Sequence, residues 1–132
     1  MKVFCFHHRD ADGFCAAVAV HEWAQRNGHS VIYKSIQYGE PVEVGSPEID
    51  RVMFVDFCPT QAELEQICKE FQEVDVIDHH KTQLSTLMAC ADKYDNMIYH
   101  YSDEVAGCVL TWNVLLGEHA PLMLQYVGDR DM

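Results

Sequence analysis

The sequence predicts an α/β fold, a parallel five-stranded sheet with helices on both faces. Short apolar segments alternate along the chain with longer segments of helical periodicity. This alternation is typical of parallel strands joined by helical crossovers. Three predicted strands also end directly in acidic or imidazole side chains. Because parallel strands bring their C-terminal ends to one edge of a sheet, we expect these side chains to meet there in a metal site.

The strand predictions depend on local composition. The segment 73–77 is short, largely apolar and contains β-branched residues but no Gly or Pro, which indicates a buried strand. The segment 30–36 instead alternates Val and Ile with polar residues. The predicted strands cover residues 2–7, 30–36, 51–56, 73–78 and 97–101. The segment from Gly39 to Asp50, with two Pro and two Gly, is predicted to be the longest loop.

The first helix is predicted to run from Gly13 to about Asn27, because Asn27-Gly28 is a helix-stop signal. Helical spacing assigns its apolar face to Phe14, Ala17, Val18, His21 and Ala24.

The second helix is predicted to begin at Thr60, since Thr60 and Glu63 have the spacing of a capping box. Its expected apolar stripe consists of Leu64, Ile67, Cys68 and Phe71. Three further helices are predicted over 83–90, over 105–116 and from about Pro121, the last carrying Leu122, Leu124, Tyr126 and Val127.

The 132 residues, 48% of them hydrophobic, suffice for one domain with a buried core. The longest apolar run is far shorter than the ~20 residues of a membrane span, and the N-terminus does not have the pattern of a secretory signal. We therefore expect a cytoplasmic protein. The six cysteines form no Cys-x-x-Cys pair, so neither a disulfide framework nor structural zinc is expected.

The formal net charge of −12 has a partly local explanation. Two divalent ions would cancel four of the negative charges near the proposed site. Six aspartates are expected there, namely Asp10, Asp12, Asp56, Asp78, Asp129 and Asp131. The remaining acidity argues against binding of long duplex nucleic acid. It permits a small phosphorylated or oligonucleotide substrate, and no membrane partner is expected. The oligomeric state cannot be deduced.

The candidate site residues follow three strands. His8-Arg9-Asp10-Ala11-Asp12-Gly13 follows the first strand, Asp56 ends the third, and Asp78-His79-His80 ends the fourth. Carboxylate oxygen and imidazole nitrogen together suit Mn²⁺, Mg²⁺ or Zn²⁺. Because the acids outnumber what one ion requires, we expect two ions that share a bridging carboxylate.

With these motifs the chain resembles the DHH phosphoesterase family. The resemblance includes His-x-Asp-x-Asp-Gly at 8–13, the lone Asp56, Asp-His-His at 78–80 and a late aspartate within 128–131. The four motifs occur in the order of the family and span nearly the whole chain. The resemblance implies hydrolysis of phosphoester or phosphoanhydride bonds with two metal ions. The ions would most often be Mn²⁺, and Mg²⁺ is possible.

The resemblance also implies roles for individual residues. His8 and Asp10 would bind one ion, Asp12 and His79 the other, and Asp56 would bridge both. Asp129 would complete the second site, although Asp131 is an alternative. Asp56 and His80 would be the catalytic residues, with His80 facing the substrate phosphate or the leaving group.

Two neighbours of these ligands would have supporting roles. Asp78 would orient His79, as carboxylates commonly do for metal-bound imidazoles. Gly13 would let the first helix begin close to the site. In a simpler alternative, Asp10 and Asp12 are acids favoured by the helix dipole. Cys58, beside Asp56, is expected to be a buried thiol.

Family members follow this domain with a smaller C-terminal domain that helps to bind substrate. This chain stops at Met132, so we expect residues 1–132 to be a single DHH-type catalytic domain truncated at its C-terminal end. Whether such a domain is active alone cannot be told from the sequence.

The leading functional prediction is a metal-dependent phosphoesterase that acts on short oligonucleotides, cyclic dinucleotides or related nucleotides through a water activated by two metals. One alternative is a hydrolase of phosphoanhydrides like inorganic pyrophosphatase. The other is a metal- or nucleotide-binding module without turnover.

Overall fold

The computed structural model describes residues 1–45 and 48–131, with side chains up to Asp129. Five parallel strands form one sheet in the order β2-β1-β3-β4-β5. The strands are β1 (Lys2–His8), β2 (Ser30–Ile36), β3 (Arg51–Val55), β4 (Glu73–Asp78) and β5 (Met97–Tyr101). The predicted sheet is confirmed, and every predicted strand boundary lies within one residue of the observed one.

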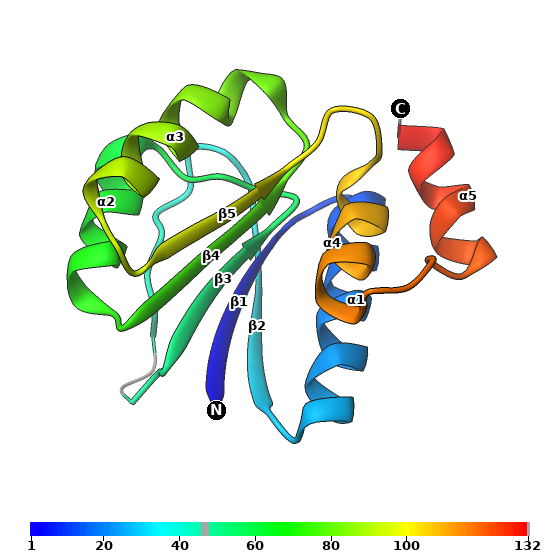
Figure 1. Ribbon diagram of the computed structural model, residues 1–132, viewed down its shortest axis with the longest axis horizontal. Helices are drawn as coiled ribbons and strands as arrows, with labels where there is room; N and C mark the ends of the chain where they lie inside the picture. The colour runs from blue at the N-terminus through cyan, green and yellow to red at the C-terminus, as the bar shows by residue number, and fades with distance from the viewer. Residues whose placement is uncertain (46–47, 132) are drawn as a thin grey trace.

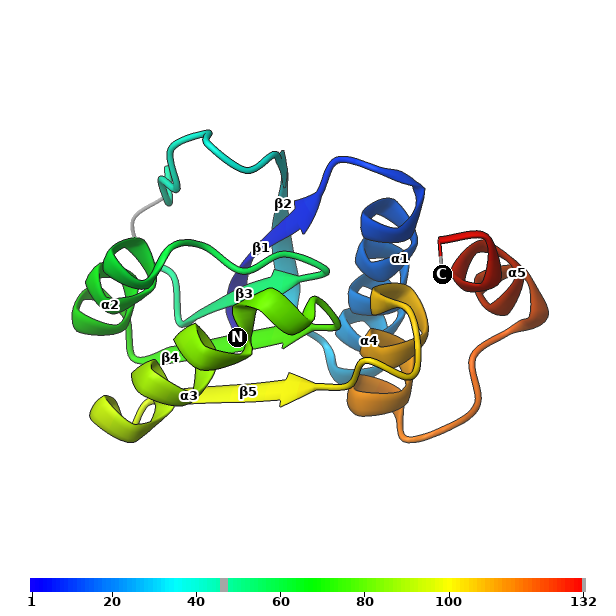
Figure 2. The same cartoon turned by 90° about the horizontal axis from the view of Figure 1, so that it is seen from above.

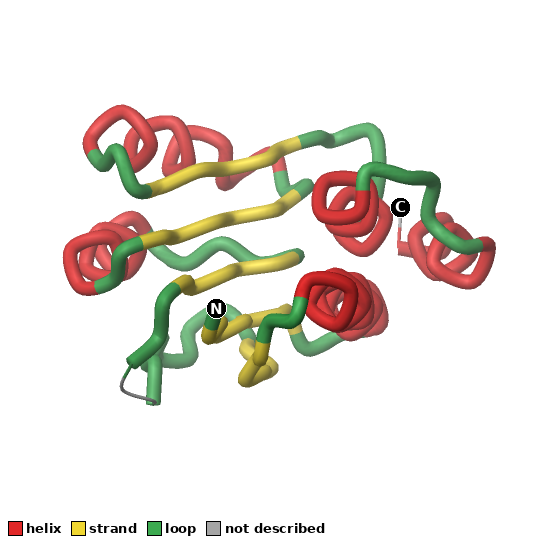
Figure 3. Tube along the Cα trace, turned by 60° about the horizontal axis from the view of Figure 1, so that its bottom comes forward, coloured by secondary structure: helices red, strands yellow, loops and turns green. Residues whose placement is uncertain are grey.

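Helices cover both faces of this sheet, as predicted (Figure 1). They are α1 (Ala11–Asn27), α2 (Gln61–Glu70), the 3₁₀ turn η1 (Lys81–Gln83), α3 (Leu84–Lys93), α4 (Gly107–Leu116) and α5 (Leu122–Asp131). Helices α2 and α3 lie on one side of the strands, and α1 and α4 lie on the other (Figure 2). Helix α5 packs outside α1 and α4, away from the sheet (Figure 3).

The strand order explains why the helices divide between the two faces. The chain passes from β1 outward to β2 and then returns to the other side of β1 to form β3. Because crossover connections are right-handed, this reversal of direction moves the connecting helices to the opposite face. The reversal also creates a topological switch point between β1 and β3, and open α/β sheets bind ligands at the carboxyl ends of the strands there.

Side-chain alternation along the strands builds two cores. On β1, Phe4 and Phe6 face the α2 and α3 side, whereas Val3 and Cys5 face the α1 and α4 side. All four are at most 4% exposed. The Phe6 ring stacks on Phe54 of the neighbouring strand, with ring centroids 5.0 Å apart. The central strands are thus buried on both faces, as their continuous apolar runs predict.

The second helix starts as predicted. The Thr60 hydroxyl accepts a hydrogen bond from the Glu63 backbone, and the Glu63 carboxylate accepts one from the Thr60 backbone. Leu64, Ile67 and Cys68 are buried beneath this helix. The predicted long loop joins β2 to β3, although its residues 46 and 47 lie outside the described part of the chain.

The predicted apolar face of the first helix is wrong except at Ala24, which is buried. Phe14 and Val18 are 52% and 47% exposed, and His21 is also exposed. The buried face carries Asp12, Gly13, Ala16, Ala19, Val20, Trp23 and Ala24. Because α1 packs against α4 and α5 as well as the sheet, small alanines fit the contact better than large side chains do. Phe14 and Val18 therefore lie on the exposed side of this helix and not on its buried side.

In the last helix, too, the buried residues differ from those predicted. Leu124 is buried at 1% exposure, but Leu122 and Tyr126 are 82% and 62% exposed. Helix α5 thus contributes mainly Leu124 to a small core with Ala19, Trp112 and Ala120. All six cysteines are free, which agrees with the expected lack of disulfides. No helix in the described residues is long and apolar enough to cross a membrane.

Gly13 is predicted to be indispensable to this fold. A Cβ atom at this position would lie 1.9 Å from the carbonyl oxygen of His8, so Gly13→Ala must push α1 away from the end of β1. We expect the substitution to lower the free energy of unfolding by about 1–3 kcal/mol or more, measured by thermal and urea unfolding. Gly45→Ala is the matched control, because no atom lies within 4 Å of its added Cβ. Equal stability of the two variants would contradict the prediction.

Candidate metal centre

The carboxyl ends of β1, β3 and β4 bring the predicted ligands together. Nδ1 of His8 lies 3.0 Å from Asp10 Oδ2 and 3.9 Å from Asp56 Oδ2. Nε2 of His79 lies 2.9 Å from Asp56 Oδ1 and 3.3 Å from Asp12 Oδ2. Side chains that are up to 71 positions apart in the sequence (8 to 79) thus meet within a few ångströms because their strands are neighbours.

Asp56 occupies the middle of this cluster. It is 1% exposed, and its backbone has a left-handed conformation with φ 57°, which is uncommon for a residue other than glycine. One of its carboxylate oxygens faces His8 and the other faces His79. A single residue therefore connects the two histidines.

The buried polar atoms of the cluster fit a cation. Both carboxylate oxygens of Asp56 and Nδ1 of His8 are buried, and the polar groups near them are other acids and histidines of the cluster. Buried acids packed together in this way are costly unless a proton or a cation balances their charge. Carboxylate oxygen and imidazole nitrogen are ligands that Mn²⁺, Mg²⁺ and Zn²⁺ accept. The donor set thus matches a divalent metal.

Two groups of potential ligand atoms share Asp56. His8, Asp10 and Asp56 form one group, and Asp56, Asp78, His79 and His80 form the other, with all atoms of a group within 4.8 Å of one another. The first group agrees with the predicted first ion site. In the second group Asp78 and His80 also lie within reach of an ion, whereas the sequence assigned them to supporting and catalytic roles.

Asp12 has a structural role besides its place near His79. Its two carboxylate oxygens accept hydrogen bonds from the backbone amides of Gly107 and Cys108, at 3.0 and 2.9 Å. These amides begin α4, which has no hydrogen-bonding side chain at its own N-cap. A carboxylate there satisfies free amides and is favoured by the helix dipole. Asp12 thereby fixes α4 against the site.

The sequence analysis missed Gly107. A Cβ atom at this position would lie 2.3 Å from Asp56 Oδ1, so a glycine is needed for α4 to approach the carboxylate. In the sequence, Gly107 is a glycine near the start of a predicted helix that follows a strand. Glycines are common at such positions, so this one could not identify a site by itself.

Gln37 is a second residue that the sequence analysis missed. Its Oε1 lies 2.9 Å from His8 Nε2, and its Nε2 donates to the backbone oxygen of Arg9. Since this second bond fixes the amide orientation, Oε1 must accept the proton of His8 Nε2, which leaves Nδ1 to face the cluster. Arg9 itself is bound to Glu40 and to Ser35. It therefore holds the turn that carries Gln37.

Asp78 contacts both of the histidines that follow it. Its Oδ1 accepts a hydrogen bond from the backbone amide of His79 and lies 2.6 Å from Nδ1 of the His80 ring. The chain turns directly after β4, which brings the His80 ring to Asp78. The role of Asp78 in orienting His79 stays a prediction. Asp78 is fully buried, so it fixes the turn and the His80 imidazole together.

The charges of the cluster are strongly coupled. Burial would raise the pKa of Asp12, but hydrogen bonds from His79 and Cys108 outweigh it and hold this pKa below its ordinary value. Burial raises the pKa of Asp56 to about 8, and contacts with Asp12 and Asp56 raise the pKa of His79 to about 10. A proton on His79 thus balances the carboxylates, and a divalent cation would replace it.

Asp129 is not in either ligand group. It is exposed and lines a pocket of about 300 Å³ between the start of α4 and α5, together with Glu104 and His119. The adjacent Gly128 packs against Ala106 and Val109. The role of Asp129 as a ligand stays a prediction, and the side chain of Asp131 lies outside the described residues. Cys58 is buried, as predicted, and burial raises the pKa of its thiol.

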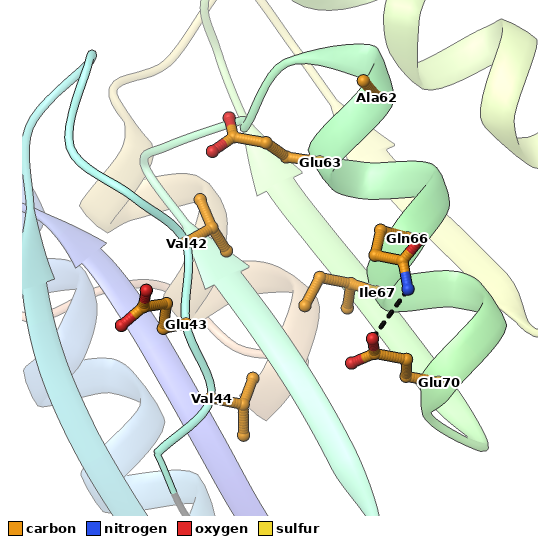
Figure 4. Close-up of a pocket in the computed structure, with 8 residues that line it drawn as sticks. All are labelled: Val42, Glu43, Val44, Ala62, Glu63, Gln66, Ile67 and Glu70. Carbon is orange, nitrogen blue, oxygen red and sulfur yellow. Dashed lines mark hydrogen bonds between the residues drawn. The ribbon is translucent and has the colours of Figure 1, made fainter.

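A larger pocket, of about 520 Å³, lies away from these ligands, between the loop after β2 and α2 (Figure 4). Val42, Val44 and Ile67 line its apolar part. Two of its three acidic residues have structural partners, since Glu63 belongs to the capping box and Glu70 accepts from Gln66 at 2.7 Å. It is not a candidate catalytic site.

Comparison with known protein families agrees with the geometry. Residues 2–127 match the model of the DHH family, N-terminal domain. The chain belongs to the DHH family. Members of this family are in general metal-dependent phosphohydrolases, and the two clusters of acids and histidines are groups that could hold metal ions. Searches of curated proteins and of solved structures found no match.

A divalent ion that fits the centre should stabilise the fold. An ion that binds only the folded state contributes about 2.7 kcal/mol at a hundred times its dissociation constant. We therefore expect Mn²⁺ to raise the melting temperature more than Ca²⁺, which prefers six to eight oxygens and suits imidazole poorly. The combined substitutions Asp12→Asn and His79→Ala should erase most of the shift.

The controls for this measurement are NaCl solutions of equal ionic strength, because salt also screens the clustered negative charges. Differential scanning fluorimetry of the wild type and the double variant measures the shift. A manganese shift no larger than that of NaCl would mean that the centre does not bind metal in this chain.

Proposed function

We propose that this chain hydrolyses phosphodiester bonds of short oligonucleotides, cyclic dinucleotides or related nucleotides at a centre of two divalent ions, with Mn²⁺ as the preferred metal. The observation that carries the proposal is the position of Asp56. A buried carboxylate that faces His8 with one oxygen and His79 with the other is suited to bridge two ions. The proposal extends the general phosphohydrolase function of the family to a substrate class and a metal.

The proposed ligands form two ion-binding positions. His8 and Asp10 would hold one ion, Asp12 and His79 the other, and Asp56 would contact both. When bound, two divalent ions would supply an activated water and positive charge that stabilises the phosphate and the departing oxygen. The fixed orientation of His8 by Gln37, and of Asp12 by the start of α4, holds these ligands in place before metal binds.

His80 would contact the substrate. Asp78 holds its Nδ1 at 2.6 Å, so Nε2 is the nitrogen left to face a phosphate oxygen or the leaving group. The His80 side chain is 33% exposed, whereas that of His79 is 11% exposed. The more open of the two histidines is thus the one assigned to substrate.

The acidity of the chain is consistent with a small substrate. With a net charge of −12, the surface would repel long duplex nucleic acid, and the metal ions would supply the attraction for a short phosphodiester. We also place the protein in the cytoplasm.

Asp56→Asn is expected to abolish turnover and leave the fold intact. A neutral amide cannot replace a carboxylate that bridges two cations. Because burial raises the pKa of Asp56 to about 8, above its unfolded value, the carboxylate reduces stability as the pH rises toward 8. Removing the charge should therefore leave the metal-free melting temperature at pH 8 equal to or above that of the wild type.

The measurement compares hydrolysis of diribonucleotides, cyclic dinucleotides, single-stranded DNA and pyrophosphate with Mn²⁺ present. Thermal melts in chelator accompany it. Near wild-type turnover by the variant would refute the bridging role. Turnover of pyrophosphate alone would favour the phosphoanhydride alternative, and metal binding without any turnover would favour a binding module.

A further inference from the structure

An exposed tyrosine stands beside the metal centre. Tyr38 lies in the turn after β2 and is 47% exposed. Its ring centroid is 5.4 Å from that of His8 and 6.4 Å from that of His80. It thus lies next to one predicted metal ligand and next to the histidine assigned to substrate.

The Tyr38 ring is supported from one side. Phe57, which is 2% exposed, lies with its ring centroid 4.8 Å away at an interplanar angle of 31°. Phe57 in turn contacts Phe54 of the sheet, at 6.5 Å. Since the core covers one side of the ring and nearly half of the residue is exposed, Tyr38 offers an aromatic surface to the solvent beside the cluster.

The backbone on both sides of Tyr38 is anchored. Gln37 is bound to His8 and to the Arg9 carbonyl, and its own backbone amide donates to Glu40 at 2.8 Å. Glu40 is paired with Arg9, also at 2.8 Å. The same hydrogen bonds that orient the His8 ligand therefore hold Tyr38 in position.

We propose that Tyr38 is a base-stacking residue, which binds the nucleobase adjoining the phosphate held at the metal centre. This inference rests on the proposed function. It identifies a residue that would let the protein bind nucleotides more tightly than inorganic phosphates. Every nucleobase has a π-face, so stacking on an aromatic ring gives affinity for nucleotides with little sequence preference. Pyrophosphate and sugar phosphates have no aromatic base to stack.

The distances fit this assignment. In a nucleotide, one sugar separates the phosphate from its base, so the stacking surface must be close to the phosphate site. Tyr38 meets that requirement because its ring contacts the rings of His8 and His80. Phe14, which is also exposed, contacts the ring of His7 instead, with ring centroids 4.9 Å apart.

The test measures binding of two product-like ligands with Mn²⁺ present. Adenosine 5′-monophosphate carries a base, and ribose 5-phosphate is its counterpart without one. Isothermal titration calorimetry of the full chain should show adenosine 5′-monophosphate binding about tenfold or more tightly. Tyr38→Leu should bring this ratio close to one, and Tyr38→Phe, which keeps the ring, should retain it.

Tyr33→Leu is the matched control, since Tyr33 is a comparably exposed tyrosine on the neighbouring strand β2, at 37%. It should not change the ratio. Equal binding of both ligands by the wild type, no detectable binding of adenosine 5′-monophosphate, or an unchanged ratio in Tyr38→Leu would each overturn the assignment. Because the readout is binding, it is separate from turnover, whose absence would instead refute the proposed hydrolase function.

Discussion

The buried carboxylate of Asp56 is the constraint on which the rest of the structure depends. It lies at the end of the central strand β3, in a left-handed backbone conformation, and its side chain is almost fully buried. A charge in such a place is costly unless an opposite charge balances it. In the structure that balance comes from His79, and in the proposed working state it would come from cations.

Several features far apart in the sequence exist to make room for this carboxylate. Gly107 lets α4 reach it, and Gly13 lets α1 start directly against the end of β1. Asp12 joins these two helices, because it belongs to α1 and accepts hydrogen bonds from the first amides of α4. The switch in strand order between β1 and β3 places the whole assembly at one edge of the sheet. The residues that shape the proposed metal centre are therefore also residues that hold the helices against the sheet.

The sequence predicted the sheet nearly residue by residue, since buried parallel strands are continuous apolar runs whose ends are marked by charged residues. It also predicted that His8, Asp10, Asp12, Asp56, His79 and Asp129 would converge. The first five do so, because they follow strands that must share an edge. It could not predict contacts that depend on helix packing. The buried side of α1 is set by α4 and α5, and the bond from Asp12 to α4 spans 95 positions. The bond between His8 and Gln37 likewise depends on the geometry of a turn.

The central claim is that Asp56 joins two metal ions in one centre. Electron paramagnetic resonance of the protein titrated with Mn²⁺ tests it directly, because two ions bridged by a carboxylate are magnetically coupled. We expect two ions per chain and the spectrum of a coupled pair, which Asp56→Asn should convert to that of isolated ions. A wild-type spectrum of isolated Mn²⁺ at saturation, with one ion per chain, would contradict the account.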